Sequence, residues 1–235
     1  AGGTFRNRTS VLGDIVNSSA TFAGAPIAQY DERVHPGYSA YASAKAGRTK
    51  MVYVGANDGM LHGFNVGNGN EEFAFVPEIL LSKTRNLSEV AYAHKSFVDA
   101  TPIAADVNVG GWKTLLFAPY GTGAKGLFAL NVTSPGSVDA NSKAWDLGAA
   151  ASSQIGYITG NPQRHPITGE PRIVSKIGPS GNWGLFLPNG YNSDYDENGV
   201  RGAGDASLIA VDLGSAADAR VTTWTPGTNL HVIPT

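Results

Sequence analysis

The sequence predicts an all-β protein, and within that class a partial β-propeller of about three blades, each with four antiparallel strands and separated by long loop insertions. Two observations predict this fold. Apolar runs are brief and bounded by Gly, Asn, Asp and Pro, and a degenerate two-stranded repeat recurs along the chain. The composition agrees, because 30 glycines supply many tight turns and 42 % hydrophobic residues can bury a sizeable core.

The repeat is a hairpin that occurs three times, at residues 51–66, 114–132 and 184–213. Each copy is an apolar strand, a turn rich in Gly, Asn or Asp, and a second strand. The second strand closes on an apolar residue, then Asn or Asp, then Val or Leu. The copies are farther apart than the roughly 40–50 residues of standard propeller repeats, so insertions must separate the strands.

Further strand-like segments flank the hairpins. Residues 12–23, 97–107 and 172–177 precede the three copies, and residues 72–76 and 144–147 follow the first two. Four antiparallel strands in each repeated unit are the layout of propeller blades. One such sheet cannot bury both of its faces alone, and radial stacking covers them. A β-sandwich built from short hairpins is the competing fold.

Two segments depart from the strand pattern. Residues 77–90 carry a weak one-face apolar pattern, which predicts a short helix. Residues 24–50 form a long insertion with three tyrosines, and two interpretations of it stay open. It is either a loop that packs its tyrosines over a blade face or a ligand-contact surface, since function concentrates on loops held by rigid scaffolds.

Charge and motif content exclude several functions. The formal net charge is −2 and Lys and Arg are not clustered, which argues against a nucleic-acid partner. No apolar run reaches the roughly 18 residues that a transmembrane helix needs. The absence of cysteine excludes disulfides and thiolate metal sites. Neither H-E-x-x-H nor G-x-S-x-G occurs, so no catalytic residue is predicted.

A candidate calcium loop lies inside the third hairpin. Its predicted ligands are Asp194, Asp196, Asn198, Val200 through its carbonyl, and Asp205. This spacing matches positions 1, 3, 5, 7 and 12 of an EF-hand loop, with the usual glycine at position 6. The twelfth residue is Asp instead of the bidentate Glu, which weakens coordination. The alternative is a solvated acidic turn, because Asp, Asn and Gly are also turn formers.

Several stretches resemble the C-terminal domain of the PilY/PilC family of type IV pilus proteins. They lie, in the family's order, at residues 12–19, 51–64, 123–135, 183–193 and 208–213. The segment around the V-G-A-N-D-G sequence is the more specific of these, whereas any single strand is not. The resemblance spans most of the chain.

The resemblance implies a non-enzymatic cell-surface protein of the type IV pilus system. Such a protein acts in pilus extension and retraction and in adhesion, with Ca²⁺ as a regulator. Its implied partners are pilin or minor pilin subunits and a host or surface receptor. Its implied place is extracellular, on the pilus at a Gram-negative-type outer membrane. Closure takes roughly four to eight blades, so residues 1–235 are expected to be a single segment of a larger propeller.

Two other functions stay open. The first hairpin also resembles the quinoprotein blade motif, so a quinoprotein-type dehydrogenase is one alternative, which a redox-dye assay with added cofactor would reveal. The sequence lacks the adjacent cysteine pair that many of those enzymes carry. A glycan-binding propeller module is the other alternative, and a glycan array would identify it.

Overall fold

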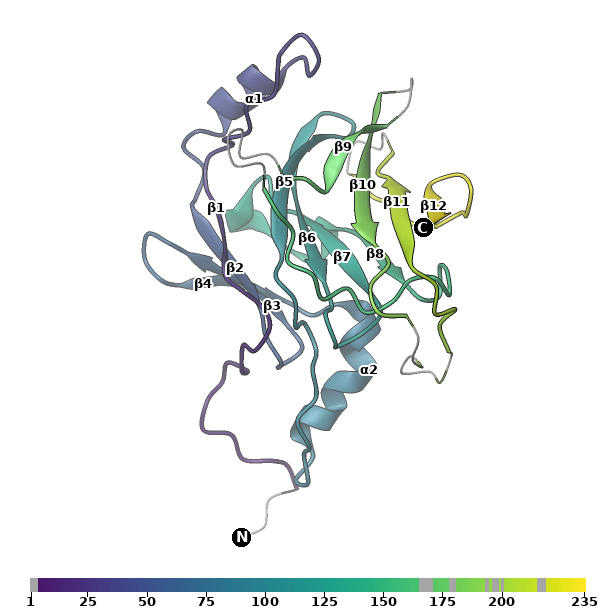
Figure 1. The fold of residues 1–235 in the computed structure, drawn as a ribbon. Helices are drawn as coiled ribbons and strands as arrows, with labels where there is room; N and C mark the ends of the chain where they lie inside the picture. Colours follow the sequence, from purple (N-terminus) through teal and green to yellow (C-terminus); the bar gives the residue numbers. More distant parts are fainter. Residues whose placement is uncertain are drawn as a thin grey trace.

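The described part of the chain contains three four-stranded antiparallel sheets, and in each sheet strands that neighbour in sequence lie side by side (Figure 1). The structure is a computed structural model and describes residues 4–164, 171–177, 181–192, 195, 199, 201–214 and 219–235. In Figure 1 the sheets follow one another from left to right, with the second sheet between the other two. The all-β propeller-type architecture predicted from the repeat is confirmed.

Each predicted hairpin forms the centre of one sheet. The first sheet contains β1 (Thr21–Ala23), β2 (Met51–Gly55), β3 (Leu61–Asn65) and β4 (Glu71–Phe75). The second contains β5 (Ile103–Asn108), β6 (Trp112–Pro119), β7 (Gly126–Asn131) and β8 (Lys143–Gly148). The third contains β9 (Val174–Ile177), β10 (Asn182–Pro188), β11 (Ser207–Asp212) and β12 (Leu230–Pro234). The last strand, β12, was not predicted.

The middle sheet is buried on both faces, and this explains its nearly continuous apolar sequence. Along β6, Leu115 and Phe117 belong to the core shared with the third sheet. Leu116 and Ala118 point the other way, into the core shared with the first sheet. Successive side chains of a strand point to opposite faces, so both sets must be apolar here. A middle sheet with another sheet on each face excludes the competing β-sandwich, which has only two facing sheets.

The helical segments are short and lie outside the sheets. Residues 78–88 form three consecutive helical pieces, which confirms the predicted helix: η1 (Glu78–Leu80), α2 (Leu81–Thr84) and η2 (Arg85–Ser88). The insertion at residues 24–50 was expected to be a loop, but it contains α1 (Tyr38–Ala44). Glu32 stabilises the start of α1, since its carboxylate accepts hydrogen bonds from the backbone N–H groups of Gly37 and Ser39. Two further 3₁₀ turns are η3 (Pro135–Ser137) and η4 (Ala140–Ser142).

The strand predicted at residues 12–23 is mostly wrong, because only Thr21–Ala23 joins the ladder. Residues 13–18, here called the N-terminal strap, make their hydrogen bonds to side chains and turns. Gly13 N–H donates to Asp58 Oδ2 at 2.6 Å, and Asn17 Nδ2 donates to Asp99 Oδ2 at 2.7 Å. The strap therefore ties the first sheet to the segment that enters the second.

None of the helices in the described part of the chain has the length and apolar character needed to cross a membrane.

Candidate functional site

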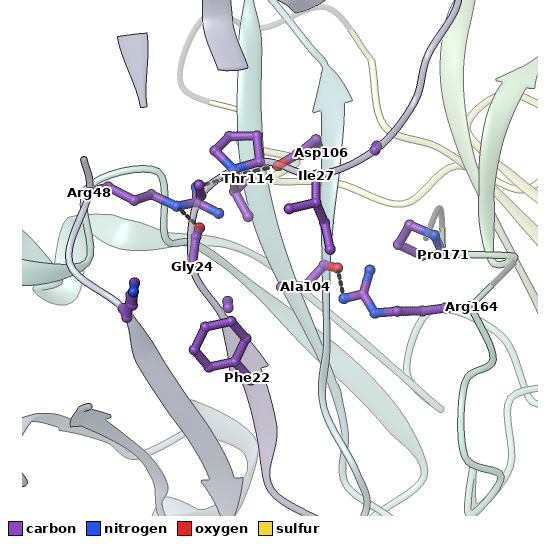
Figure 2. A pocket seen from close by; sticks show the side chains of 14 residues that line it. Phe22, Gly24, Ile27, Arg48, Ala104, Asp106, Thr114, Arg164 and Pro171 are labelled. Atoms are coloured by element: carbon purple, nitrogen blue, oxygen red, sulfur yellow. Dashed lines mark hydrogen bonds between the residues drawn. The ribbon is translucent and has the colours of Figure 1, made fainter. Parts of the chain in front are cut away.

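A pocket of about 470 Å³ lies where the first sheet meets the second. The first strands of these sheets, β1 and β5, lie against each other, and the Thr21 hydroxyl donates to the Pro102 carbonyl at 2.5 Å. The pocket opens beside this contact (Figure 2). It is lined by Phe22, Ala23, Gly24, Ala25, Pro26, Ile27, Ala28, Arg48, Lys50, Ala104, Asp106, Thr114, Arg164 and Pro171. Small-molecule sites typically measure roughly 300–1,000 Å³, so the pocket can hold a ligand.

The local sequence explains why this space stays open. Residues 24–28 leave β1 as a chain of small side chains with one proline and one isoleucine, and the facing position on β5 is Ala104. Alanine and glycine cannot fill the space between the two sheets. The larger apolar side chains at the rim, Phe22 and Ile27, are 57 % and 69 % exposed.

A buried carboxylate, Asp106, is part of the pocket lining. Its Oδ1 accepts the Thr114 hydroxyl at 2.6 Å, and its Oδ2 accepts the Tyr38 hydroxyl at 2.8 Å. Burial, followed by the Asp106 charge, raises the pKa of Tyr38 above its usual range. Tyr38 therefore stays protonated and continues to donate its hydroxyl to the carboxylate.

Two arginines enter the pocket from opposite sides (Figure 2). Arg48 Nη1 donates to Thr114 Oγ1 at 2.5 Å, and its Nε donates to the Gly24 carbonyl. Arg164 Nη2 donates to the Ala104 carbonyl at 2.6 Å. Lys50 adds a third cationic side chain to the lining. Among the lining residues of the described chain the only carboxylate is Asp106, so the pocket is cationic overall.

The tyrosines of the insertion pack against Trp112 of the second sheet and Trp183 of the third, in line with the first interpretation of residues 24–50. Tyr30 and Tyr38 surround Trp112, with ring centroids 5.6 and 4.7 Å away. Tyr30 also reaches Trp183 of the third sheet at 5.4 Å. Residues 24–28 and Arg48, at the two ends of the same insertion, line the pocket, and ligand contact there stays a prediction. Sequence reasoning missed this site, since its residues come from segments that lie far apart in the sequence.

Two aspartates near the strands that begin the first two sheets, Asp14 and Asp99, accept hydrogen bonds from neighbouring turns. Asp99 accepts hydrogen bonds from Asn17 and from the Thr122 hydroxyl at 2.9 Å. Burial favours the neutral acid, but these hydrogen bonds prevail and lower the pKa of Asp99. Asp14 accepts from Asn57 at 3.1 Å and contacts His94 at 2.7 Å. These carboxylates connect the N-terminal strap to the sheets.

Most of the predicted calcium loop lies outside the described residues. Asp194, Asp196, Asn198 and Val200 are among the residues that the structure does not describe, whereas Asp205 is described and exposed. The carbonyl of Asp205 accepts a hydrogen bond from Asn189 Nδ2 at 2.7 Å. Across the ranges that are described, no three His, Cys, Asp or Glu side chains are grouped to hold a metal. Calcium binding at 194–205 stays a prediction.

Comparison with known protein families decides the classification. The family model of the PilY1 β-propeller domain matches residues 12–223. The chain belongs to this family. Its match begins at the N-terminal strap, covers all three sheets up to β11, and includes every stretch that carried the resemblance at residues 12–213.

Curated PilY1 relatives agree with the family model. The type IV pilus biogenesis factor PilY1 of Pseudomonas aeruginosa strain UCBPP-PA14 is 38 % identical over 219 residues, covering 89 % of this chain and 17 % of that protein. A PilY1 homologue of Xylella fastidiosa is 37 % identical over 217 residues, covering 90 % of this chain and 16 % of that protein. The chain thus spans only a small part of these PilY1 proteins.

A solved PilY1 structure shares the fold. The crystal structure of the Pseudomonas aeruginosa PilY1 C-terminal domain matches with a TM-score of 0.60 and 33 % identity. The match covers 83 % of this chain and 35 % of that one. The three sheets described here therefore correspond to part of the PilY1 C-terminal β-propeller domain.

Proposed function

We propose that this chain is a non-catalytic propeller segment on the cell surface that acts in type IV pilus biogenesis. The observation that carries the proposal is the 38 % identity, over 219 residues, with a protein named a type IV pilus biogenesis factor. The architecture supports it, because stacked sheets form a rigid scaffold that presents long loops to other proteins.

The partners proposed for this surface are pilin or minor pilin subunits, with adhesion to a host or surface receptor as a second role. Large apolar side chains near the N-terminus support a protein contact. Those with high exposure are Phe5, Val11, Leu12, Ile15 and Val16. Exposed apolar side chains that gather into a patch are typical of protein-interaction sites.

Calcium is proposed as a regulator through the loop at residues 194–205. The spacing of its oxygen-bearing residues supports this proposal. One end of the loop is also fixed, because the buried Asn189 side chain bonds the Asp205 carbonyl and the Ser207 N–H. A fixed end reduces the conformational entropy that ion binding must overcome.

The pilus role is tested by in-frame deletion of the coding region for residues 12–223 in a bacterium that assembles type IV pili. The expected result is loss of surface pili and of twitching motility, with an unchanged cellular pool of pilin. A strain carrying Gly136→Ala is the matched control, because a Cβ at this position meets nothing within 4 Å. Normal surface piliation in the deletion strain would contradict the proposed function.

A further inference from the structure

The pocket between the first two sheets combines an exposed apolar wall with cationic side chains. Phe22 and Ile27 are more than half exposed, and both line the same hollow together with Pro26. Large apolar side chains that gather around a concave surface are typical of ligand sites. The apolar part of an occupant would contact this wall, and its charged group would contact the cationic side chains.

Two of the cationic side chains in the lining, Arg48 and Lys50, are available to an anionic occupant. Within the described part of the chain, neither Arg48 nor Lys50 forms an ion pair with a carboxylate. Asp106, a carboxylate in the lining, already accepts two hydroxyl donors. An occupant that carries a negative charge would therefore gain attraction without displacing an internal ion pair.

Arg48 is held in place for such a role by Thr114. A threonine hydroxyl has one donor and two acceptor positions. Thr114 donates to Asp106, which leaves its oxygen to accept from Arg48 and from the Tyr41 hydroxyl at 2.5 and 2.7 Å. The Gly24 carbonyl binds Nε of Arg48 on the other side. The guanidinium is thus fixed, and it has further N–H donors that can bind a carboxylate.

The apolar wall favours singly charged anions over doubly charged ones. Moving a doubly charged group such as phosphate into a mostly apolar hollow costs more desolvation energy than moving a single carboxylate. Arginine also matches the planar geometry of a carboxylate with two parallel hydrogen bonds. The preferred occupant is therefore a monoanion with an apolar body.

We propose that this pocket binds the carboxylate of an amphiphilic ligand, with the carboxylate at Arg48 and the apolar part against Phe22 and Ile27. A free medium-chain carboxylic acid and the C-terminal residue of an apolar peptide share this chemistry. The pocket's chemistry is independent of any role in pilus assembly, so a ligand can be sought with the isolated chain.

The test uses amide NMR spectra of the purified chain titrated with three probes: octanoate, acetyl-Ala-Val-Leu with a free carboxylate, and the same peptide as its C-terminal amide. We expect at least one carboxylate to shift the resonances of Ile27 and Ala104, and the amide to leave them unchanged. Shifts with octanoate alone assign the site to free acids, and shifts with the peptide alone assign it to peptide C-termini. Inorganic phosphate is the fourth probe and should not compete.

Variants locate the binding. Arg48→Gln should weaken carboxylate affinity about tenfold, the effect of one lost charge-assisted pair. Arg33→Gln removes the same charge from a side chain that is 89 % exposed and does not line the pocket, and it should not alter affinity. If Arg48→Gln fails to fold, Lys50→Gln replaces it, with an expected loss of about threefold because the side chain is solvated.

Three results would overturn the proposal. One is that neither carboxylate shifts the pocket resonances. Another is that the peptide amide or phosphate binds as well as the carboxylates do. The third is an equal loss of affinity in Arg33→Gln and in the pocket variants, which would indicate a general charge effect.

Discussion

His62 Nε2 lies 3.2 Å from both carboxylate oxygens of Asp58, which sits in the turn between β2 and β3. On the other side of the ring, Nδ1 contacts Oε1 of Glu71 at 2.5 Å. The side chains of His62 and Asp58 are only 3 % and 1 % exposed, so solvent screens them little. Because Asp58 also binds the N–H of Gly13, this pair anchors the N-terminal strap to the first sheet.

The stability of the chain should depend on pH through this pair. Burial lowers the pKa of His62, but its hydrogen bonds to Asp58 and Glu71 outweigh burial, so the net pKa is raised. Burial raises the pKa of Asp58, but its hydrogen bonds with His62 and the Gly13 N–H outweigh burial, so the net pKa is lowered. The His62 contribution is complete below the unfolded pKa of about 6.5 and is lost as pH rises through the raised native value. The Asp58 contribution is present above the unfolded pKa of about 3.9 and is lost as pH falls through the lowered native value.

We therefore expect the melting temperature to be highest between about pH 4 and pH 6.5 and to fall as pH rises through the raised native pKa of His62. Thermal unfolding followed by circular dichroism measures this profile. His62→Gln should flatten its alkaline side. His94→Gln is the control, since the His94–Asp14 pair is 53 % and 51 % exposed. An unchanged alkaline slope in His62→Gln would show that another group produces it.

Gly126→Ala should strongly destabilise the second sheet. Gly126 begins β7 at φ +113°, and a Cβ there would lie 1.9 Å from the Leu147 carbonyl oxygen. Backbone strain and this clash should lower the free energy of unfolding by about 3 kcal/mol or more, and the melting temperature by roughly 6 °C or more. Gly136→Ala, with nothing within 4 Å of its Cβ, should stay within about 0.5 kcal/mol. Equal stability of the two variants would refute this account of Gly126.

Tyr38→Phe should destabilise the region where α1 packs on the second sheet. The substitution removes the donor to Asp106 Oδ2 and the acceptor of the Ala28 N–H. Loss of partners for buried polar groups costs about 1–3 kcal/mol, measurable by urea unfolding. Tyr191→Phe is the matched control, because Tyr191 is 59 % exposed. A loss no larger than that of the control would mean that water replaces the Tyr38 hydroxyl.

Calcium should stabilise the chain if the loop at 194–205 binds it. Sites in extracellular modules have dissociation constants up to about 1 mM, so about 10 mM Ca²⁺ should add roughly 1.4 kcal/mol or more. The double variant Asp194→Asn and Asp196→Asn should abolish the increase in melting temperature, and Asp205→Asn should reduce it. Asp31→Asn, at an exposed aspartate outside the loop, should retain the full increase. If calcium does not change the melting temperature of the wild-type chain, the loop is a solvated acidic turn and not a calcium site.

The hairpins were predictable because strand and turn signals are local. Residues 51–66 are two apolar runs around an Asn-Asp-Gly turn, and β2 pairs with β3 across that turn. The helix α1 was missed because its short Ala- and Tyr-rich sequence has no side-chain N-cap at Gly37. Its carboxylate partner, Glu32, lies in the preceding loop. The strand β12 was missed because it is a short run whose hydrogen bonds come from β11.

The sequence by itself determined the three hairpins, the all-β class and the family, because each depends on residues close together in the chain. Only the tertiary structure decided the candidate pocket. Arg48, Thr114 and Arg164 are far apart in sequence, and they meet because β1 and β5 lie against each other between two stacked sheets. Such contacts depend on how sheet faces bury apolar area against one another, which no local pattern encodes.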